Sequence, residues 1–538
     1  MNSPAQYRWY VVSGAVAALV LMPLTVLLLS WYQIDTEIWG HLLDTQMTRL
    51  LSNTFTLIVG VGLGVVLLGV SLAWLTALCE FPGRRWLDWA LMLPFAIPAY
   101  VLAFVFIGIF DFAGPVQTLM REWFGMGVRF PRVRSTGGVV LVLVLVFYPY
   151  VYLLARSAFL SQGRGLMEAA RVLGQTPWQA FWRVAMPMAR PAIGAGLALA
   201  LMETLADFGA VSVFNYDTFT TAIYKTWYGF YSLSSATQLA SLLLIGVMVL
   251  LYLERRSRGA ARPANERARS GELYRLRGWK AWLATSWCLL VFACAFVIPV
   301  IQLMVWLWQR GRFDWDERYS SLIAHTLWLG SMAAVITVAV AVLLAFAQRQ
   351  APVKGVRAAI SLANTGYALP GSVLAVAIML VFSYLDNEWV VPLSNWLGGS
   401  GKPFLLGSLG ALLLAYLIRF MAVAFGPVEN SLARVKSSLP QASRSLGVGG
   451  FALFGRVYFP LLLPGILSAA LLVFVDVLKE MPATLLMRPF GWDTLAVRIF
   501  EMTSEGEWAR ASLPALTLVA VGLIPVIFLI RRSAKLPR

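Results

Sequence analysis

The sequence predicts an all-α membrane protein with about 12 transmembrane helices, arranged as two parallel repeats of six. Its 538 residues are 59% hydrophobic and 13% charged, whereas charged residues make up about 25% of a typical soluble protein. Twelve apolar runs are each long enough to cross the hydrocarbon core of a bilayer, which requires about 20 residues per helix. Motifs in the first half of the chain also recur in the second half at a nearly constant spacing, which indicates an internal repeat.

The apolar runs fall into two sets of six. The first run follows a nearly neutral N-terminus and is too long for the core of a signal peptide, so we expect it to be a retained span. In the second run, Gly60 and Gly64 form a GxxxG pair, which is typical of a close helix-packing face. The predicted spans are 9–31, 53–79, 87–110, 137–158, 191–213 and 236–253, followed by 281–307, 326–347, 358–384, 404–426, 463–486 and 511–531.

Two further motifs support the repeat. The sequence AIPAYVLA at 96–103 recurs as ALPGSVLA at 368–375, and NTFTL at Asn53 recurs more weakly as HTLWL at His325. An even number of spans separates the copies, so the two repeats are predicted to run in the same sense. The predicted domains are a first repeat at 1–253, a linker at 254–280 and a second repeat at 281–538.

Positive charge predicts which loops face the cytoplasm. The linker has eight arginines and one lysine against three glutamates, and loops of this kind remain cytoplasmic. Both chain termini then also lie in the cytoplasm. The outer loop 111–135 is an exception, with four arginines against two acidic residues, and would suit an acidic partner outside.

The net charge of +17 does not indicate a nucleic acid partner, because the arginines stand beside apolar spans that face a lipid bilayer.

One segment occurs twice and lies before the fifth span of each repeat. Residues 167–191 read MEAARVLGQTPWQAFWRVAMPMARP, and residues 441–464 read QASRSLGVGGFALFGRVYFPLLLP. A glycine and two prolines recur in step, at one constant spacing between the copies. The glycine allows a tight bend or a close backbone approach, and the first proline suits the start of the next helix. Each copy is therefore predicted to be a helix, a bend and a second helix.

Both copies resemble the EAA loop of membrane subunits of ATP-binding-cassette (ABC) importers, whose pattern is E-A-A, three residues, G, nine residues and I-x-L-P. The second copy is degenerate. The resemblance implies that residues 168–187 and 441–460, here called the docking segments, each seat on one of two copies of a cytoplasmic ATPase. The alternative is an interfacial linker helix without a partner. The predicted coupling residues are Glu168, Ala169, Ala170, Gly174, Pro187, Gln441, Gly447 and Pro460.

The chemistry of an enzyme is not indicated. The sequence has no GxxxxGK[ST] phosphate loop, so ATP and Mg²⁺ would be bound by the partner ATPase and not by this chain. Three cysteines lie in or beside apolar runs, and the two histidines are far apart in sequence. These patterns favour neither a disulfide framework nor a stable metal site.

Two pairs of acidic residues follow the docking segments. Glu203 and Asp207 recur in the second repeat as Asp476 and Glu480, at the same spacing as the docking segments. Residues four apart share one face of a helix, and a charge inside a membrane costs at least about 2.5 kcal/mol. We predict that these four intramembrane carboxylates line a translocation path and contact a cation transiently. The alternative is structural, with the carboxylates capping helices or pairing with Lys479 and other residues.

The sequences around these carboxylates narrow the resemblance. VDVLKEMPATLLMRPFGWDTLA at 475–496 and LADFGAVSVFNYDTFTTAIY at 205–224, in one fused double-length chain, resemble the ferric-iron permeases of type I ABC importers. The resemblance implies a bacterial inner-membrane protein that receives iron from a periplasmic ferric-ion-binding protein. Thiamine importers share the fused layout, and phosphonate or polyamine importers share the unit. A proton-coupled secondary carrier is the alternative from another class, but it would need no paired docking segments.

Overall fold

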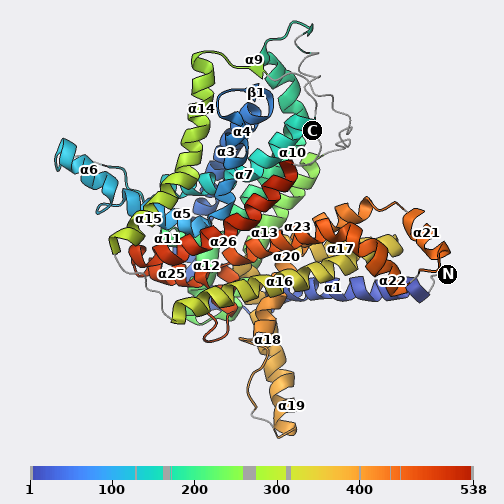
Figure 1. Cartoon of the computed structure of the whole chain (residues 1–538). Coiled ribbons are helices and arrows are strands. Elements are labelled where there is room, and N and C mark those ends of the chain that lie inside the picture. The colour runs from blue at the N-terminus through green and yellow to red at the C-terminus, as the bar shows by residue number, and fades with distance from the viewer. Residues whose placement is uncertain are drawn as a thin grey trace. The chain divides into compact units, whose positions relative to one another are not determined.

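The protein is almost entirely helical in its computed structural model, so the all-α prediction is confirmed (Figure 1). The strands described, β1 (Cys79–Glu80) and β2 (Tyr274–Arg275), form one short parallel pair. The structure describes residues 4–127, 130–161, 170, 172–258, 274–310, 317–398, 401–436, 438–448 and 450–534.

The chain divides into two compact units, each formed from several segments. Unit 1 contains Met1–Trp39, Ile223–Leu242 and Asp314–Arg498. Its helices are α1 (Pro4–Leu29), α16 (Glu317–Gln350), α17 (Lys354–Ala363), α18 (Gly371–Leu385), α19 (Val391–Trp396), α20 (Leu409–Ala433), α21 (Ser438–Ser445), α22 (Gly450–Leu453), α23 (Phe459–Lys479) and α24 (Pro482–Met487), with 3-10 turns at Ser30–Tyr32 and Asn364–Ala368 and π-helical turns at Asp386–Val390 and Phe454–Tyr458.

Unit 2 contains Gly40–Ala222, Leu243–Phe313 and Ile499–Arg538. Its helices are α3 (Thr48–Leu78), α4 (Arg84–Ala90), α5 (Ala99–Phe110), α6 (Pro115–Phe124), α7 (Thr136–Ser161), α9 (Pro177–Ala180), α10 (Met186–Ala206), α11 (Gly209–Val213), α14 (Trp279–Phe292), α15 (Ile298–Arg310) and α26 (Trp508–Ala534), with a 3-10 turn at Leu93–Ala96 and π-helical turns at Leu43–Met47, Phe181–Ala185 and Ala293–Val297. The chain crosses the limits of the two units within α2 (Thr36–Leu42), α12 (Phe219–Phe230), α13 (Leu233–Arg258) and α25 (Leu495–Ser504).

Twelve helices among the described residues are long and apolar enough to cross a membrane, which agrees with the predicted number of spans. Several continue beyond the apolar run that predicted them. The second, for example, extends from Thr36 to Leu78 because a π-helical turn joins α2 to α3. A membrane protein of 12 spans is therefore supported by helix length as well as by composition.

The predicted GxxxG face lies between α3 and α7 of unit 2. A side-chain carbon added at Gly60 would meet Val140, and one added at Gly64 would meet Val144. The absence of a side chain at these positions lets the two helices approach closely. The prediction of a packing face is confirmed.

The third predicted span is broken in both repeats. The helix of 87–110 is interrupted before Pro98, and that of 358–384 is interrupted before Pro370. Both prolines are extended and stand directly before a new helix, α5 or α18. The repeated motif thus marks a helix start, which suits proline because it has no N–H to be satisfied there.

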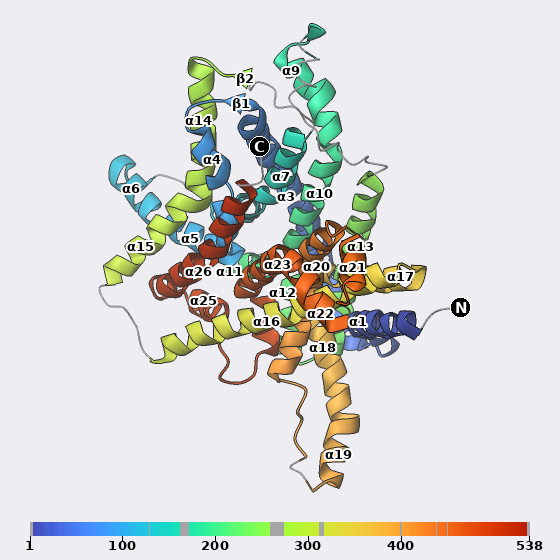
Figure 2. The same cartoon turned by 45° about the vertical axis from the view of Figure 1, so that its right-hand side comes forward.

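The compact units take helices from both predicted repeats. The first helix of the chain, α1, packs against α16, α17 and α18 of unit 1, as Figures 1 and 2 also show. In unit 2, α15 packs against α5 and α26. The limits 1–253, 254–280 and 281–538 therefore describe a sequence repeat and remain a prediction about domains.

Candidate functional site

The first docking segment bends at a glycine. Gly174 has a φ of +78°, and the N–H of Gln175 donates to the carbonyl of Ala170 at 3.0 Å. This bond and the left-handed glycine are the marks of a Schellman cap, which ends a helix. Of the other predicted coupling residues, Glu168 and Ala169 lie outside the described residues.

The second docking segment has the same bend at the corresponding glycine. Gly447 has a φ of +79°, and the N–H of Val448 donates to the carbonyl of Ser443 at 3.0 Å. Gln441 is exposed on α21. An added side-chain carbon at either glycine would meet nothing within 4 Å. The bend, and not a close approach within this chain, is therefore what requires glycine.

The two segments differ after the bend. In the first, Thr176 and Gln179 form a reciprocal capping box. The N–H of Thr176 donates to Oε1 of Gln179 at 3.0 Å, and the N–H of Gln179 donates to Oγ1 of Thr176 at 3.3 Å. Pro177 begins α9 between them. In the second, Ala452 stands at the position of Gln179 and cannot accept such a bond. The degeneracy noted in the sequence thus has a structural counterpart.

Pro187 and Pro460 stand in the first turn of α10 and α23, as expected, but neither helix begins after a break in the chain. The helix continues from α9 into α10 and from α22 into α23 through π-helical turns that precede Pro187 and Pro460. In these turns Met186 donates to Phe181 and Phe459 donates to Phe454, five residues back. The wider turn lets a helix continue past a residue that has no N–H.

Each π-helical turn is fixed to its own unit by aromatic rings. The ring of Phe181 meets Trp74 of α3 edge-on at 4.5 Å. At the corresponding place in unit 1, Phe454 meets Phe346 of α16 at 5.5 Å. Such pairs stabilise packing by about 0.5–1.5 kcal/mol beyond the buried area. The docking segments are therefore tied to the second helix of each repeat.

An apolar residue before each glycine was missed by the sequence analysis. Leu173 and Leu446 have 81% and 82% of their surface exposed. They occupy equivalent positions beside the two bends. The available signal was that they recur at the same spacing as the two glycines. Exposed leucines at matched positions form a surface that suits a protein groove.

The intramembrane carboxylates lie where helices end. Helix α10 ends at Ala206, and Asp207 accepts a bond at Oδ1 from the N–H of Val211 at 3.0 Å. Helix α23 ends at Lys479, and Glu480 accepts a bond at Oε1 from the N–H of Ala483 at 3.1 Å. Asp207 and Glu480 each follow the last helical residue, and their side chains accept bonds from the first turns of α11 and α24.

Unit 1 places cations beside its carboxylates. Arg419 of α20 lies 3.3 Å from Glu480, and their side chains are only 11% and 5% exposed. Lys479 lies 3.6 Å from Asp476. A side-chain carbon at Gly371 would collide with both Arg419 and Glu480, so glycine leaves room for this ion pair. The sequence analysis missed Arg419, although an arginine within an apolar span was visible.

The corresponding place in unit 2 has different residues. Val146 of α7 stands at the position of Arg419, and Ala99 stands at the position of Gly371. Asp207 is held instead by backbone donors, and its own carbonyl accepts a bond from Thr220 at 2.6 Å. Capping and pairing are the contacts of the structural alternative, while a role in translocation stays a prediction.

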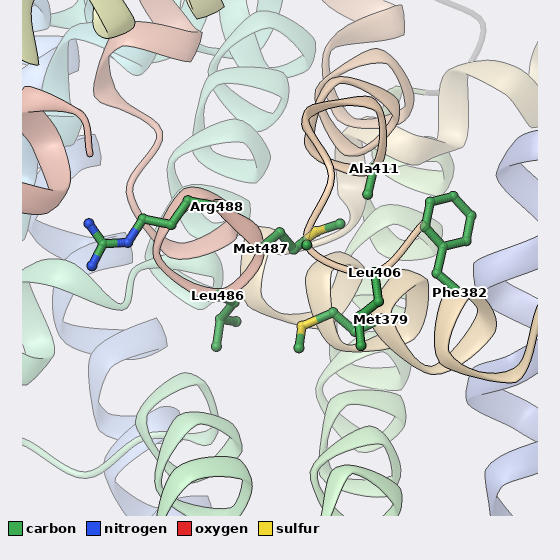
Figure 3. Close-up of a pocket in the computed structure, with 8 residues that line it drawn as sticks. Met379, Phe382, Leu406, Ala411, Leu486, Met487 and Arg488 are labelled. Carbon is green, nitrogen blue, oxygen red and sulfur yellow. The ribbon is translucent and has the colours of Figure 1, made fainter. Parts of the chain in front are cut away.

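A small pocket in unit 1 has a mostly apolar lining (Figure 3). Met379 and Phe382 of α18 and Met487 of α24 contribute to it, while Arg488 points away and pairs with Asp493. In the described part of the chain, no group of three or more His, Cys, Asp or Glu side chains lies close enough to hold a metal ion. The pocket therefore suits packing or small apolar groups and not a cation.

Comparisons with known proteins show which permeases the chain is similar to. Residues 65–254 match the family described as binding-protein-dependent transport system inner membrane component. The chain is 27% identical over 503 residues to the Fe(3+)-transport system permease protein FbpB 2 of Haemophilus influenzae, and the match covers 91% of this chain and 90% of that one. It is 32% identical over 146 residues to the molybdenum transport system permease protein ModB of Escherichia coli, covering 27% of this chain and 62% of that one.

A probable sulfate transport system permease protein of Chlorokybus atmophyticus is 34% identical over 145 residues, and the match spans about half of that protein, 49%. The family description and the relatives agree with the 12 apolar helices and with the resemblance predicted from the docking segments. A permease of this kind works with a periplasmic binding protein and an ATPase. The chain is therefore similar to the inner-membrane permeases of binding-protein-dependent transport systems, and its 12 apolar helices fit a multi-pass membrane protein.

Proposed function

We propose that the chain is the permease of a ferric-iron importer and receives iron from a periplasmic ferric-ion-binding protein. The observation that carries this proposal is the relative named as an Fe(3+)-transport permease, whose match extends through 91% of this chain and 90% of its own length. The molybdenum and sulfate relatives match over only 27% of the chain. Matches of that length are expected from a shared permease unit, whereas a full-length match includes the fused layout.

Separate ATPases would supply the energy. The chain has no GxxxxGK[ST] loop, so ATP and Mg²⁺ would be bound by two copies of a cytoplasmic ATPase, one on each docking segment. The chain would then be a transporter subunit and not an enzyme. The exposed Leu173 and Leu446 support this assignment, because each stands at a capped bend that presents it outward. Both termini and the linker 254–280 would lie on the ATPase side.

One continuous helix would couple each docking segment to a carboxylate. The helix from Pro177 to Ala206 is about 45 Å long at 1.5 Å per residue, and so is the helix from Gly450 to Lys479. When the ATPases close, these helices would carry the movement to Asp207 and Glu480. Carboxylate oxygens are hard ligands, which suit a small, highly charged cation. With Glu203 and Asp476 they would form an acidic path that passes iron without holding it.

The substrate is tested by uptake in cells that lack the permease gene. We expect loss of uptake of ⁵⁵Fe(III) presented on its periplasmic binding protein, with thiamine, sulfate and molybdate uptake unchanged. Re-expression of the full chain should restore iron uptake. Loss of thiamine uptake with normal iron uptake would assign the chain to thiamine, and loss of oxyanion uptake would assign it to sulfate or molybdate.

The docking assignment is tested by placing a charge on the exposed leucines. Leu173→Asp or Leu446→Asp should reduce iron uptake at least about tenfold and release the ATPase during purification from membranes, because a buried unpaired charge opposes docking. Leu173→Met is the matched control and should remain active. Normal uptake in both Asp variants, or active transport without any copurified ATPase, would favour a secondary carrier.

A further inference from the structure

The loop between the third and fourth predicted spans carries a short helix in each repeat, and both helices end alike. In unit 2, α6 ends with Trp-Phe-Gly at 123–125. In unit 1, α19 ends with Trp-Leu-Gly at 396–398, which is the same spacing as between the two docking segments. Gly125 and Gly398 both have positive φ, +85° and +75°. Both repeats therefore have a tryptophan followed, two residues later, by a glycine of positive φ.

These helix ends carry apolar faces without cover from the described part of the chain. Trp123 and Trp396 have 76% and 81% of their surface exposed. None of the residues of α6 is buried. Before and on α19, Trp389, Leu393 and Trp396 are all exposed and are spaced as one helical stripe. Large apolar faces of this kind mark contact with another molecule or with lipid.

Both faces are backed by polar residues, so each helix is amphipathic. On α6, Arg121 and Glu122 lie beside Trp123 in sequence but on other sides of the helix. The guanidinium of Arg121 folds over the ring of Phe112 at 4.2 Å and donates to the Phe112 carbonyl at 2.8 Å. On α19, Asn395 occupies the place that corresponds to Glu122.

The helices lie close to membrane spans. Only four residues separate Phe110, the end of α5, from Pro115, the start of α6, and four residues extend at most about 14 Å. Helix α19 is continuous with α18, and apolar character is high through Gly371–Trp396. Figures 1 and 2 show α19 at the end of an arm that leaves the rest of unit 1 across the direction of α1 and α16. Both helices therefore begin beside a candidate membrane span.

We propose that α6 and α19 are interfacial anchors whose tryptophan faces lie in the headgroup layer of the outer leaflet. Tryptophan is enriched at this level of a membrane because its ring is apolar and its N–H can bind water or headgroups. Amphipathic helices with aromatic and apolar residues on one face lie in the same layer. The basic outer loop then has a ligand, since Arg121, Arg132 and Arg134 would meet lipid phosphates. Such contacts explain why the predicted outer loop 111–135 is rich in arginine, although arginines are expected mainly in cytoplasmic loops.

The test places a fluorescent probe at each tip and on each polar face. In a full-length chain with Cys79, Cys288 and Cys294 replaced by alanine, single cysteines are introduced as Trp123→Cys and Trp396→Cys and labelled with bimane. Glu122→Cys and Asn395→Cys, one residue earlier, are the matched controls. The chains are reconstituted in phosphatidylcholine–phosphatidylglycerol liposomes with or without lipids brominated near the headgroup. Iodide is the water-soluble quencher.

We expect brominated lipid to quench the two tip labels at least about twofold more than the controls, and iodide to quench them at least about twofold less. Equal quenching by iodide at tip and control positions would overturn the proposal. Shielding that appears only after a periplasmic binding protein is added would also overturn it and make the faces protein-docking surfaces. A second measurement uses the unmodified chain, in which a diazirine in the lipid headgroup should label the peptides that contain Trp123 and Trp396. Absence of that labelling would contradict the anchor.

Discussion

The two units contain the same long helix with different side chains around the carboxylate at its end. In each, one helix leads from a docking segment to a carboxylate that caps the next short helix, Asp207 before α11 and Glu480 before α24. In unit 1, Arg419 holds Glu480 in a buried ion pair. In unit 2, the position of that arginine is Val146. The duplication has therefore conserved a cap but not its electrostatic partner.

The difference between the two units extends to the first residues of α18 and α5. Gly371 begins α18 where Ala99 begins α5, and only glycine leaves room for Arg419 and Glu480. Arginine and glycine in unit 1 thus correspond to valine and alanine in unit 2. A symmetric pair of carboxylates in the sequence need not have symmetric roles. Glu480 is bound into the structure of its unit, whereas Asp207 lacks an arginine at that place.

The largest effect is expected from breaking the ion pair. Arg419→Met leaves the buried carboxylate of Glu480 without its partner and should lower the stability of the permease by about 3–5 kcal/mol. Thermal unfolding in detergent, followed by size-exclusion chromatography, measures the loss. Adding Glu480→Gln to Arg419→Met should recover most of it, because no buried charge is then unpaired. A single variant as stable as the parent would show that the pair contributes little.

A smaller effect is expected from exchanging the residues at the two helix starts. Gly371→Ala forces a methyl group against Arg419 and Glu480 and should cost about 1–3 kcal/mol. Ala99→Gly in unit 2 removes a methyl group from the start of a helix and should cost at most about 1 kcal/mol. The same unfolding assay compares them. Equal losses would mean that the space at Gly371 is not reserved for the ion pair.

Removing charge separates transport from stability in the two units. Glu203→Gln with Asp207→Asn should lower iron uptake about tenfold, which corresponds to about 1.4 kcal/mol in the barrier, while stability changes little. Asp476→Asn with Glu480→Gln should lower uptake and stability together, because the Arg419–Glu480 and Lys479–Asp476 ion pairs are lost. If the unit 2 variant transports iron normally and only unfolds earlier, its carboxylates are structural as well.

Sequence patterns predicted the features of this molecule that depend on neighbouring residues in the sequence. Apolar length predicted the number of spans, GxxxG predicted the face between α3 and α7, and the repeated glycine predicted both bends. Each follows from local rules of hydrophobicity or backbone conformation. The coupling and path roles of the named residues remain predictions.

Features that depend on contacts between residues far apart in the sequence could not be predicted from these patterns. Helix caps at Asp207 and Glu480 require the helix to end one residue earlier, and spacing alone does not fix helix ends to that accuracy. The Arg419–Glu480 pair joins α20 to the end of α23, two helices that are far apart in sequence. The continuation of the helix past Pro187 requires a π-helical turn, which the sequence pattern of an ordinary helix does not indicate.

The smallest effect concerns the two docking segments, which differ in how the second helix begins. Thr176→Ala removes one half of the capping box with Gln179 and should weaken the start of α9 by about 1 kcal/mol. Amide hydrogen exchange at 178–182 should then accelerate about fivefold, because local opening becomes easier by that free energy. Gly449→Thr with Ala452→Gln places the same residue types in the second segment and should slow exchange at 451–455. Unchanged exchange after Thr176→Ala would mean that packing of Phe181 on Trp74, and not the capping box, holds the start of this helix.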